Sequence, residues 1–269
     1  WIHNGSAAEL GRLLEDCRQT HEREFGTRQG LVSVLQLTHS GRYSFENQRV
    51  AYSHPILDSY PYANQVGLPP RSAPWRIADD DYLAALEEKF VEAAVLAREI
   101  GFDGIDLKMT HGYLLVELLS GRSRAGPYGG SLANRARFAL NVLRKIRARV
   151  GDDFLLAVRL GVYDGLPYAV LEDGSGGIPR VHARPYVWGF GVNPENPFEP
   201  DLVEPLQVIA LLKEAGVRLL NVSMGNPYVN PHIGRPYEKP NEGAYFEPEH
   251  PLVGVARHFD ATAHIKAAF

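Results

Sequence analysis

Cysteine is almost absent from this chain, with Cys17 the single thiol among 269 residues. One thiol excludes an internal disulfide and a cysteine-based metal cluster, and a lone thiol is typical of a reducing compartment. Because Cys17 lies in a stretch with helical spacing, we expect it to pack against the protein interior. The chain also lacks an apolar run long enough to cross a membrane and a charged N-terminal segment followed by an apolar one. It therefore predicts a cytoplasmic protein with no membrane partner.

An excess of one charge is also missing. The chain carries 28 Lys and Arg residues against 32 Asp and Glu residues, a formal net charge of -4, and no block of like charges stands out. This balance excludes the basic surface that nucleic-acid binding requires. The histidines show neither the spacing of a metal-binding pair on a helix nor a carboxylate triad, so no metal centre is expected. A composition of 45% hydrophobic and 22% charged residues predicts one globular domain over residues 1–269.

Helical and strand patterns alternate along the chain. Periodic apolar positions predict helices over residues 7–24, 79–100, 132–150 and 202–215, and from residue 251 to the end. Continuous apolar segments predict buried strands over residues 31–37, 103–107, 154–160 and 218–222. Strands that alternate with helices in this way form a parallel sheet covered on both faces.

Two architectures fit four such strands, a doubly wound sheet and part of a barrel. Long connections over residues 38–78 and 161–201 follow two of the strands, on the side where the strands end. Elaborate loops on that side are typical of barrel enzymes. We therefore expect an α/β fold of the (β/α)8 TIM barrel class, with only the middle strands and helices present in this chain.

Three proton-donating side chains, Lys108, His111 and Tyr113, follow the strand over residues 103–107. Side chains just beyond the carboxyl end of a barrel strand face the mouth where ligands bind. Gly112 permits a tight turn that lets both rings reach one pocket. Taken alone, Lys108 is compatible with a Schiff-base lysine, a ligand-binding cation or a structural ion pair. The segment is the predicted active site.

Polar residues interrupt two of the apolar strands. Gln36 lies within the first strand and Arg159 near the end of the third. Buried polar groups need partners. If the two strands share a barrel, these groups suit a planar polar ligand such as a flavin ring, whose gain of electrons calls for positive charge. Hydrogen-bonded or salt-bridged core residues are the alternative interpretation.

Five motifs occur in a consistent order over nearly the whole chain: QLTHSGR at residues 36–42, GFDGID at 101–106, HGYL at 111–114, YGGS at 128–131 followed by Asn134, Arg135 and Phe138, and VRL at 158–160. Together they resemble the old yellow enzyme family of flavin-dependent ene-reductases. The resemblance implies an eight-stranded α/β barrel that holds FMN at its mouth. It also implies reduction of an activated C=C bond in a small unsaturated carbonyl substrate, with hydride that NADH or NADPH first gives to the flavin.

The resemblance also implies roles for single residues. Gln36 matches the contact with the flavin pyrimidine and Arg159 the cation beside flavin N1 and O2. Tyr113 matches the proton donor to the alkene, and His111 the second member of the pair that binds the substrate carbonyl. Lys108 stands where the first member of that pair is usually histidine. This difference leaves two alternatives open, a substrate that carries a carboxylate and an altered redox potential.

Coverage is a second departure from the family pattern. The first two and last two barrel strands have no counterpart in this chain, and the last pair holds the FMN phosphate in the family. We expect weak retention of FMN by this chain alone and exposed strand edges that favour a homo-oligomer. Two alternatives to the ene-reductase hypothesis remain, an aldolase-like Schiff-base lyase that uses Lys108 and a noncatalytic fragment without flavin.

Overall fold

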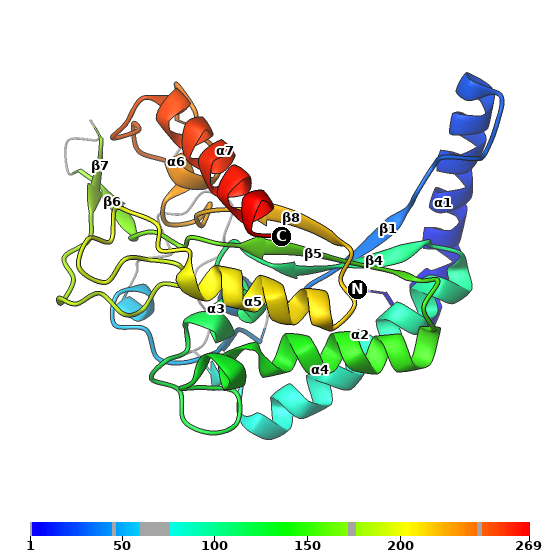
Figure 1. Ribbon diagram of the computed structural model, residues 1–269, viewed down its shortest axis with the longest axis horizontal. Coiled ribbons are helices and arrows are strands. Elements are labelled where there is room, and N and C mark those ends of the chain that lie inside the picture. The colour runs from blue at the N-terminus through cyan, green and yellow to red at the C-terminus, as the bar shows by residue number, and fades with distance from the viewer. Residues whose placement is uncertain (1, 45–46, 60–75, 172–175, 241–243) are drawn as a thin grey trace.

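A computed structural model describes residues 2–44, 47–59, 76–171, 176–240 and 244–269. Its centre is a parallel sheet with the strand order β1-β4-β5-β8 (Figure 1). These strands are the four predicted ones: β1 (Val34–Leu37), β4 (Gly104–Met109), β5 (Leu155–Gly161) and β8 (Leu219–Ser223). Each strand pairs with the next of the four along the chain, as in a barrel. Within the described residues the sheet stays open.

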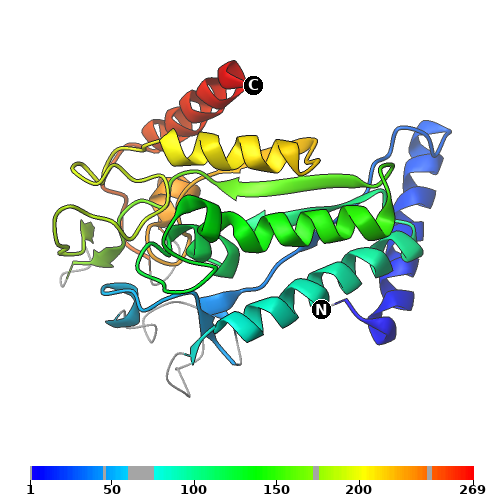
Figure 2. The ribbon, with the colours of Figure 1, turned by 60° about the horizontal axis from the view of Figure 1, so that its bottom comes forward.

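Three helices follow the strands and pack together beside the sheet: α2 (Asp80–Ile100), α4 (Leu132–Val150) and α5 (Val203–Glu214) (Figure 2). The side chain of Asp79 accepts a hydrogen bond from the Tyr82 N–H and so begins α2, while Gly101, with φ of 105°, ends it. Ser131 caps α4 through the Asn134 N–H, as the sequence predicts. The predicted bounds of all three helices agree with the structure to within one residue.

The two faces of the sheet differ in chemistry. Alternate side chains such as Ile105, Leu107 and Val158 are fully buried in the main core. The other face carries polar side chains, and we call it the polar face; its members are Gln36, Asp106, Lys108, Arg159 and Asn221. The expectation of strands that are apolar on both sides was therefore wrong. The reason is that this face corresponds to a barrel interior, where polar groups meet a ligand.

Helix α1 (Asn4–Phe25) lies at one end of the molecule, where it contacts α2 (Figure 1). Leu14 is its buried residue, whereas Leu13 is 60% exposed. Cys17 is exposed as well, so the expectation that it packs in the interior was wrong. Its helical spacing was identified correctly, but its side chain lies on an exposed part of the helix surface.

Several short elements lie in the long connections. Helix α3 (Leu114–Ser120) was not predicted, because seven consecutive buried residues leave no periodic pattern. The other short elements are η1 (Gly41–Tyr43), β2 (Arg49–Val50), η2 (Leu57–Ser59), β3 (Arg76–Ile77), β6 (Tyr168–Val170), β7 (Gly177–Pro179) and α6 (Pro231–Gly234). Parts of the two predicted long loops, residues 60–75 and 172–175, fall outside the described residues.

The last helix, α7 (Pro251–Ala268), begins where the sequence predicts and contacts both α6 and β8. His250 caps it by accepting the Leu252 N–H. Within the described part of the chain, none of the helices combines the length and the apolar character needed to cross a lipid bilayer.

Candidate active site

Lys108 lies near the carboxyl end of β4, in register with Arg159 of β5. Its Nζ is 3.5 Å from the centre of the Tyr113 ring, a cation–π contact. Its ammonium has neither a hydrogen bond nor an ion pair with any residue that the structure describes. Burial, and then the charge of Arg159, lower the pKa of Lys108 from 10.5 to about 8. The structural ion pair considered for this lysine is therefore not formed with any carboxylate that the structure describes.

The turn after β4 has the tight geometry that Gly112 suggested. Both His111 and Gly112 adopt left-handed backbone angles, with φ of 65° and 69°. A Cβ at residue 112 would lie 2.1 Å from Nδ2 of Asn226, so only glycine fits. A non-glycine residue at positive φ is strained and recurs at functional sites. Here the strained turn places the His111 ring 3.2 Å from the Ser223 Oγ at the end of β8.

His111 lies among positive charges. Burial, and then the charges of Arg159, Lys108 and Arg235, lower its pKa from 6.5 to about 4. At neutral pH the ring is therefore uncharged and carries one N–H that can donate a hydrogen bond. The surrounding charge is positive, which suits a substrate oxygen that gains negative charge during the reaction.

Tyr113 occupies the N-cap position of α3. Its hydroxyl lies 3.1 Å from the hydroxyl of Tyr228, and its ring lies 6.2 Å from the ring of Tyr43. Tyr43 and Tyr228 stack on each other with centroids 3.9 Å apart. Sequence reasoning missed Tyr228 because it lies 115 residues from Tyr113 along the chain. Its position just after a predicted strand was the one available signal.

Gln36 and Arg159 share the polar face but differ in their contacts. Gln36 is exposed, so the expectation of a buried amide was wrong, and its Nε2 donates to Oδ2 of Asp106 at 2.7 Å. Arg159 Nε and Asp106 Oδ1 are buried and have no partner among the described residues. Unsatisfied buried groups of this kind are rare and call for a ligand or water. The polar face thus fits a planar group that offers both acceptors and donors, as the ring system of FMN does.

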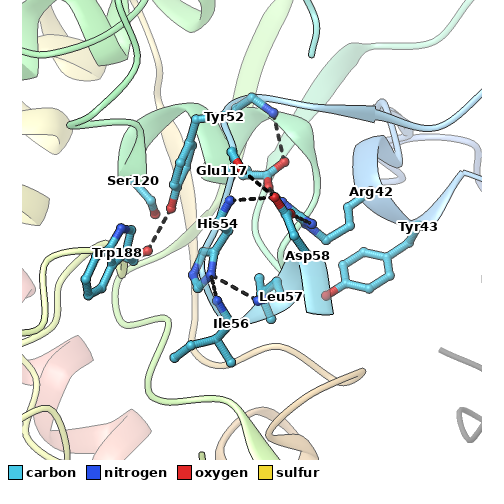
Figure 3. Close-up of polar contacts among 12 residues, drawn as sticks. Arg42, Tyr43, Tyr52, His54, Ile56, Leu57, Asp58, Glu117, Ser120 and Trp188 are labelled. Carbon is cyan, nitrogen blue, oxygen red and sulfur yellow. Dashed lines mark hydrogen bonds and ion pairs between the residues drawn. The ribbon is translucent and has the colours of Figure 1, made fainter. Parts of the chain in front are cut away.

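A buried ion-pair network anchors the loop that follows β1 (Figure 3). The Arg42 side chain is fully buried, and it donates to Glu117 Oε1 at 3.0 Å and to Asp58 Oδ1 at 2.6 Å. Glu117 belongs to α3 and also accepts the Ala51 N–H at 3.1 Å. We call Arg42, Asp58 and Glu117 the anchoring network. It joins the segment that carries Tyr43 to the helix that begins at Tyr113.

The structure therefore brings together four of the five predicted site residues. Lys108, His111, Tyr113 and Arg159 meet at the carboxyl ends of β4 and β5. Gln36 lies on the same face, but its register partner Asp106 is two residues before Lys108 along β4, and its amide is engaged there.

Comparison with known proteins gives this site a context. Residues 27–170 match the NADH:flavin oxidoreductase / NADH oxidase family, and this match covers more than half of the chain. An NADH oxidase from Thermoanaerobacter brockii is 29% identical over 198 residues, which are 73% of this chain and 25% of that protein. The 12-oxophytodienoate reductase 7 of Oryza sativa subsp. japonica is 36% identical over 178 residues, 57% of this chain and 42% of the reductase. The chain thus spans less than half the length of these relatives.

A solved structure shows the same fold. A 2-naphthoyl-CoA reductase in complex with 2-naphthoyl-CoA superposes with a TM-score of 0.54 and 22% sequence identity, over 85% of this chain and 30% of that one. Together with the family match, this likeness confirms the expected partial (β/α)8 barrel.

Proposed function

Because this chain belongs to the NADH:flavin oxidoreductase / NADH oxidase family, that of the old yellow enzymes, we propose that its protein reduces an activated C=C bond in an α,β-unsaturated carbonyl compound. The cofactors of the family are FMN and NADH or NADPH, as the sequence motifs indicated. The chemistry that bound FMN supplies is transfer of hydride from the nicotinamide to the alkene. One observation carries the proposal: Lys108, His111 and Tyr113 converge beside Arg159 where the strands end.

Arg159 and Gln36 are the residues that would hold the flavin ring. The Arg159 Nε, buried and without a partner, supplies a donor and a positive charge on the polar face. The Gln36 Nε2 carries two hydrogens. One donates to Asp106, and the second would donate to the flavin ring. These contacts concern the ring alone, because the FMN phosphate site of the family lies on strands that have no counterpart here.

His111 and Lys108 would bind the substrate carbonyl oxygen. The neutral His111 ring donates one N–H, and the Lys108 ammonium has hydrogen-bond donors to spare. Positive charge and preset donors stabilise the enolate-like oxygen that forms as hydride arrives at the alkene. Since both groups are held by the strand end and a strained turn, little rearrangement is needed.

Tyr113 would deliver the proton that completes the reduction. A tyrosine hydroxyl is a competent general acid when it is positioned beside the reacting carbon. Its backbone is set by the start of α3, and its ring is fixed between Lys108 and the two tyrosines. The hydroxyl is therefore placed by contacts from three separate segments of the chain.

The test is to measure the two half-reactions separately in FMN-loaded protein expressed from the complete gene. In Tyr113→Phe, flavin reduction by NADH or NADPH should stay within about twofold of wild type, while reoxidation by the alkene should slow by about 10² to 10⁴. A wild-type protein that binds no FMN, or that no activated alkene reoxidises, contradicts the proposal. A borohydride-trapped adduct at Lys108 would instead favour the Schiff-base lyase.

A further inference from the structure

The turn after β8 is held rigidly by two asparagines. Asn226 Oδ1 accepts the Tyr228 N–H at 3.0 Å, and Asn230 Oδ1 accepts the Asn226 N–H at 2.6 Å. Asn230 Nδ2 donates to the carbonyl oxygens of Asp164 and Leu166, both at 2.8 Å. Asn230 is fully buried. The backbone of Tyr228 is therefore fixed by contacts on both of its sides.

The Tyr228 ring is fixed as well. It stacks on Tyr43 with an interplanar angle of 20°, and the Tyr43 hydroxyl accepts a hydrogen bond from Asn226 Nδ2 at 2.8 Å. Tyr43 in turn follows Arg42 of the anchoring network. This arrangement fixes the direction of the Tyr228 hydroxyl, which lies 3.1 Å from the Tyr113 hydroxyl.

This hydroxyl pair matters because Tyr113, as the proposed acid, is left negatively charged once it gives up its proton. A phenol that donates to a phenolate makes a charge-assisted hydrogen bond, about twice as strong as a neutral one. The Lys108 ammonium over the Tyr113 ring stabilises the same charge. Burial, and then the bond to Tyr113, raise the pKa of Tyr228 well above its ordinary value, so Tyr228 is protonated when Tyr113 ionises and can donate to it.

We propose that Tyr228 is a positioning residue that stabilises ionised Tyr113 and restores its proton; this inference rests on the proposed role of Tyr113 as acid. The Tyr113 proton goes to the substrate carbon, the Tyr228 proton passes to the Tyr113 oxygen, and solvent reprotonates Tyr228, whose side chain is partly exposed. These steps transfer protons only and change no oxidation state. Each phenol oxygen ends protonated, as it began, and solvent supplies the proton that replaces the one retained by the substrate.

The test uses Tyr228→Phe in the FMN-loaded protein, with Tyr237→Phe as the matched control. Tyr237 also has a half-buried phenol, but its hydroxyl donates to the Tyr245 carbonyl at 2.7 Å and not to Tyr113. We expect Tyr228→Phe to slow reoxidation by the alkene about tenfold with flavin reduction unchanged, as for loss of one charge-assisted hydrogen bond. In a Tyr113→Phe background the same change should have no further effect, because the two phenols act as one unit. Tyr237→Phe should leave both half-reactions unchanged.

A second readout does not depend on turnover. The tyrosinate absorbance that disappears in Tyr113→Phe should form at higher pH in Tyr228→Phe than in wild type, and at the wild-type pH in Tyr237→Phe. An unchanged titration, a loss confined to KM, or an effect that persists without the Tyr113 hydroxyl would overturn the inference. If no alkene reoxidises wild-type enzyme, the proposed function fails, and the titration still decides whether Tyr228 stabilises the Tyr113 anion.

Discussion

Arg42 and Arg159 are both cations inside the protein, yet their surroundings differ. Arg42 is fully buried, and two carboxylates, Asp58 and Glu117, neutralise it (Figure 3). Arg159 lies on the polar face next to two other basic groups, Lys108 and His111, and its Nε has no partner among the described residues. A paired buried cation maintains architecture, whereas an unpaired one costs stability and is retained where a ligand supplies the partner. The contrast separates the scaffold from the site.

Breaking the anchoring network should have the largest effect. Arg42→Met removes one cation and leaves two carboxylates, one of them fully buried, without their partner. Loss of one member of a buried pair typically costs about 3–5 kcal/mol of unfolding free energy. Denaturant unfolding of the whole protein measures this loss. Arg159→Met is the matched control and should cost less than about 1 kcal/mol while weakening FMN binding; equal losses for the two variants would remove the distinction.

Asp164 should give the next largest effect, through pH. It lies beside the anchoring network, accepting from Ser120 Oγ at 2.9 Å and from the Phe190 N–H at 2.8 Å. Burial raises its pKa from 3.8 to about 6. The folded state then binds this proton more tightly than the unfolded state, so Asp164 costs stability as the pH rises from about 4 to about 6. The shift corresponds to roughly 3 kcal/mol.

Asp164→Asn removes the carboxyl group and with it this pH-dependent loss of stability. The free energy of unfolding of the variant minus that of wild type should increase between pH 4 and pH 6, by up to roughly 3 kcal/mol. His54 serves as the control for the sign of the pH dependence. Burial lowers the pKa of His54 from 6.5 to about 3. Its contribution has the opposite sign, because it is lost as the pH falls below about 6.5. A difference that does not change over this pH range would show that Asp164 is ionised in the folded protein.

The sequence patterns identified those features of the fold that depend on residues close together along the chain. The caps Asp79 and Ser131, the four strands and the tight turn at Gly112 are each set within a few residues along the chain. The anchoring network and the contact of Tyr113 with Tyr228 join residues 75 and 115 positions apart, and no local pattern reports such pairs. Gln36 was correctly placed on a strand, yet its exposure and its bond to Asp106 depend on which face the helices cover.

Lys108, which has no ion pair with the residues that the structure describes, gives the smallest expected effect in this comparison of site and scaffold. Its pKa of about 8 means that the ammonium is charged at neutral pH and loses its charge as the pH rises through 8. If it stabilises the carbonyl oxygen, reoxidation by the alkene should slow above pH 8 in wild type. Lys108→Gln should be about tenfold slower at pH 7, consistent with loss of one charged hydrogen bond, and should show no such decline.

Lys145→Gln is the control, because that lysine is paired with Glu87 and Glu88. It should change the reoxidation rate less than twofold. A comparison of substrates sharpens the test further: an unsaturated carboxylate should lose more from Lys108→Gln than an uncharged unsaturated ketone, since it also loses an ionic contact. A decline above pH 8 that persists in Lys108→Gln would assign that titration to another group and leave Lys108 without a role at the carbonyl.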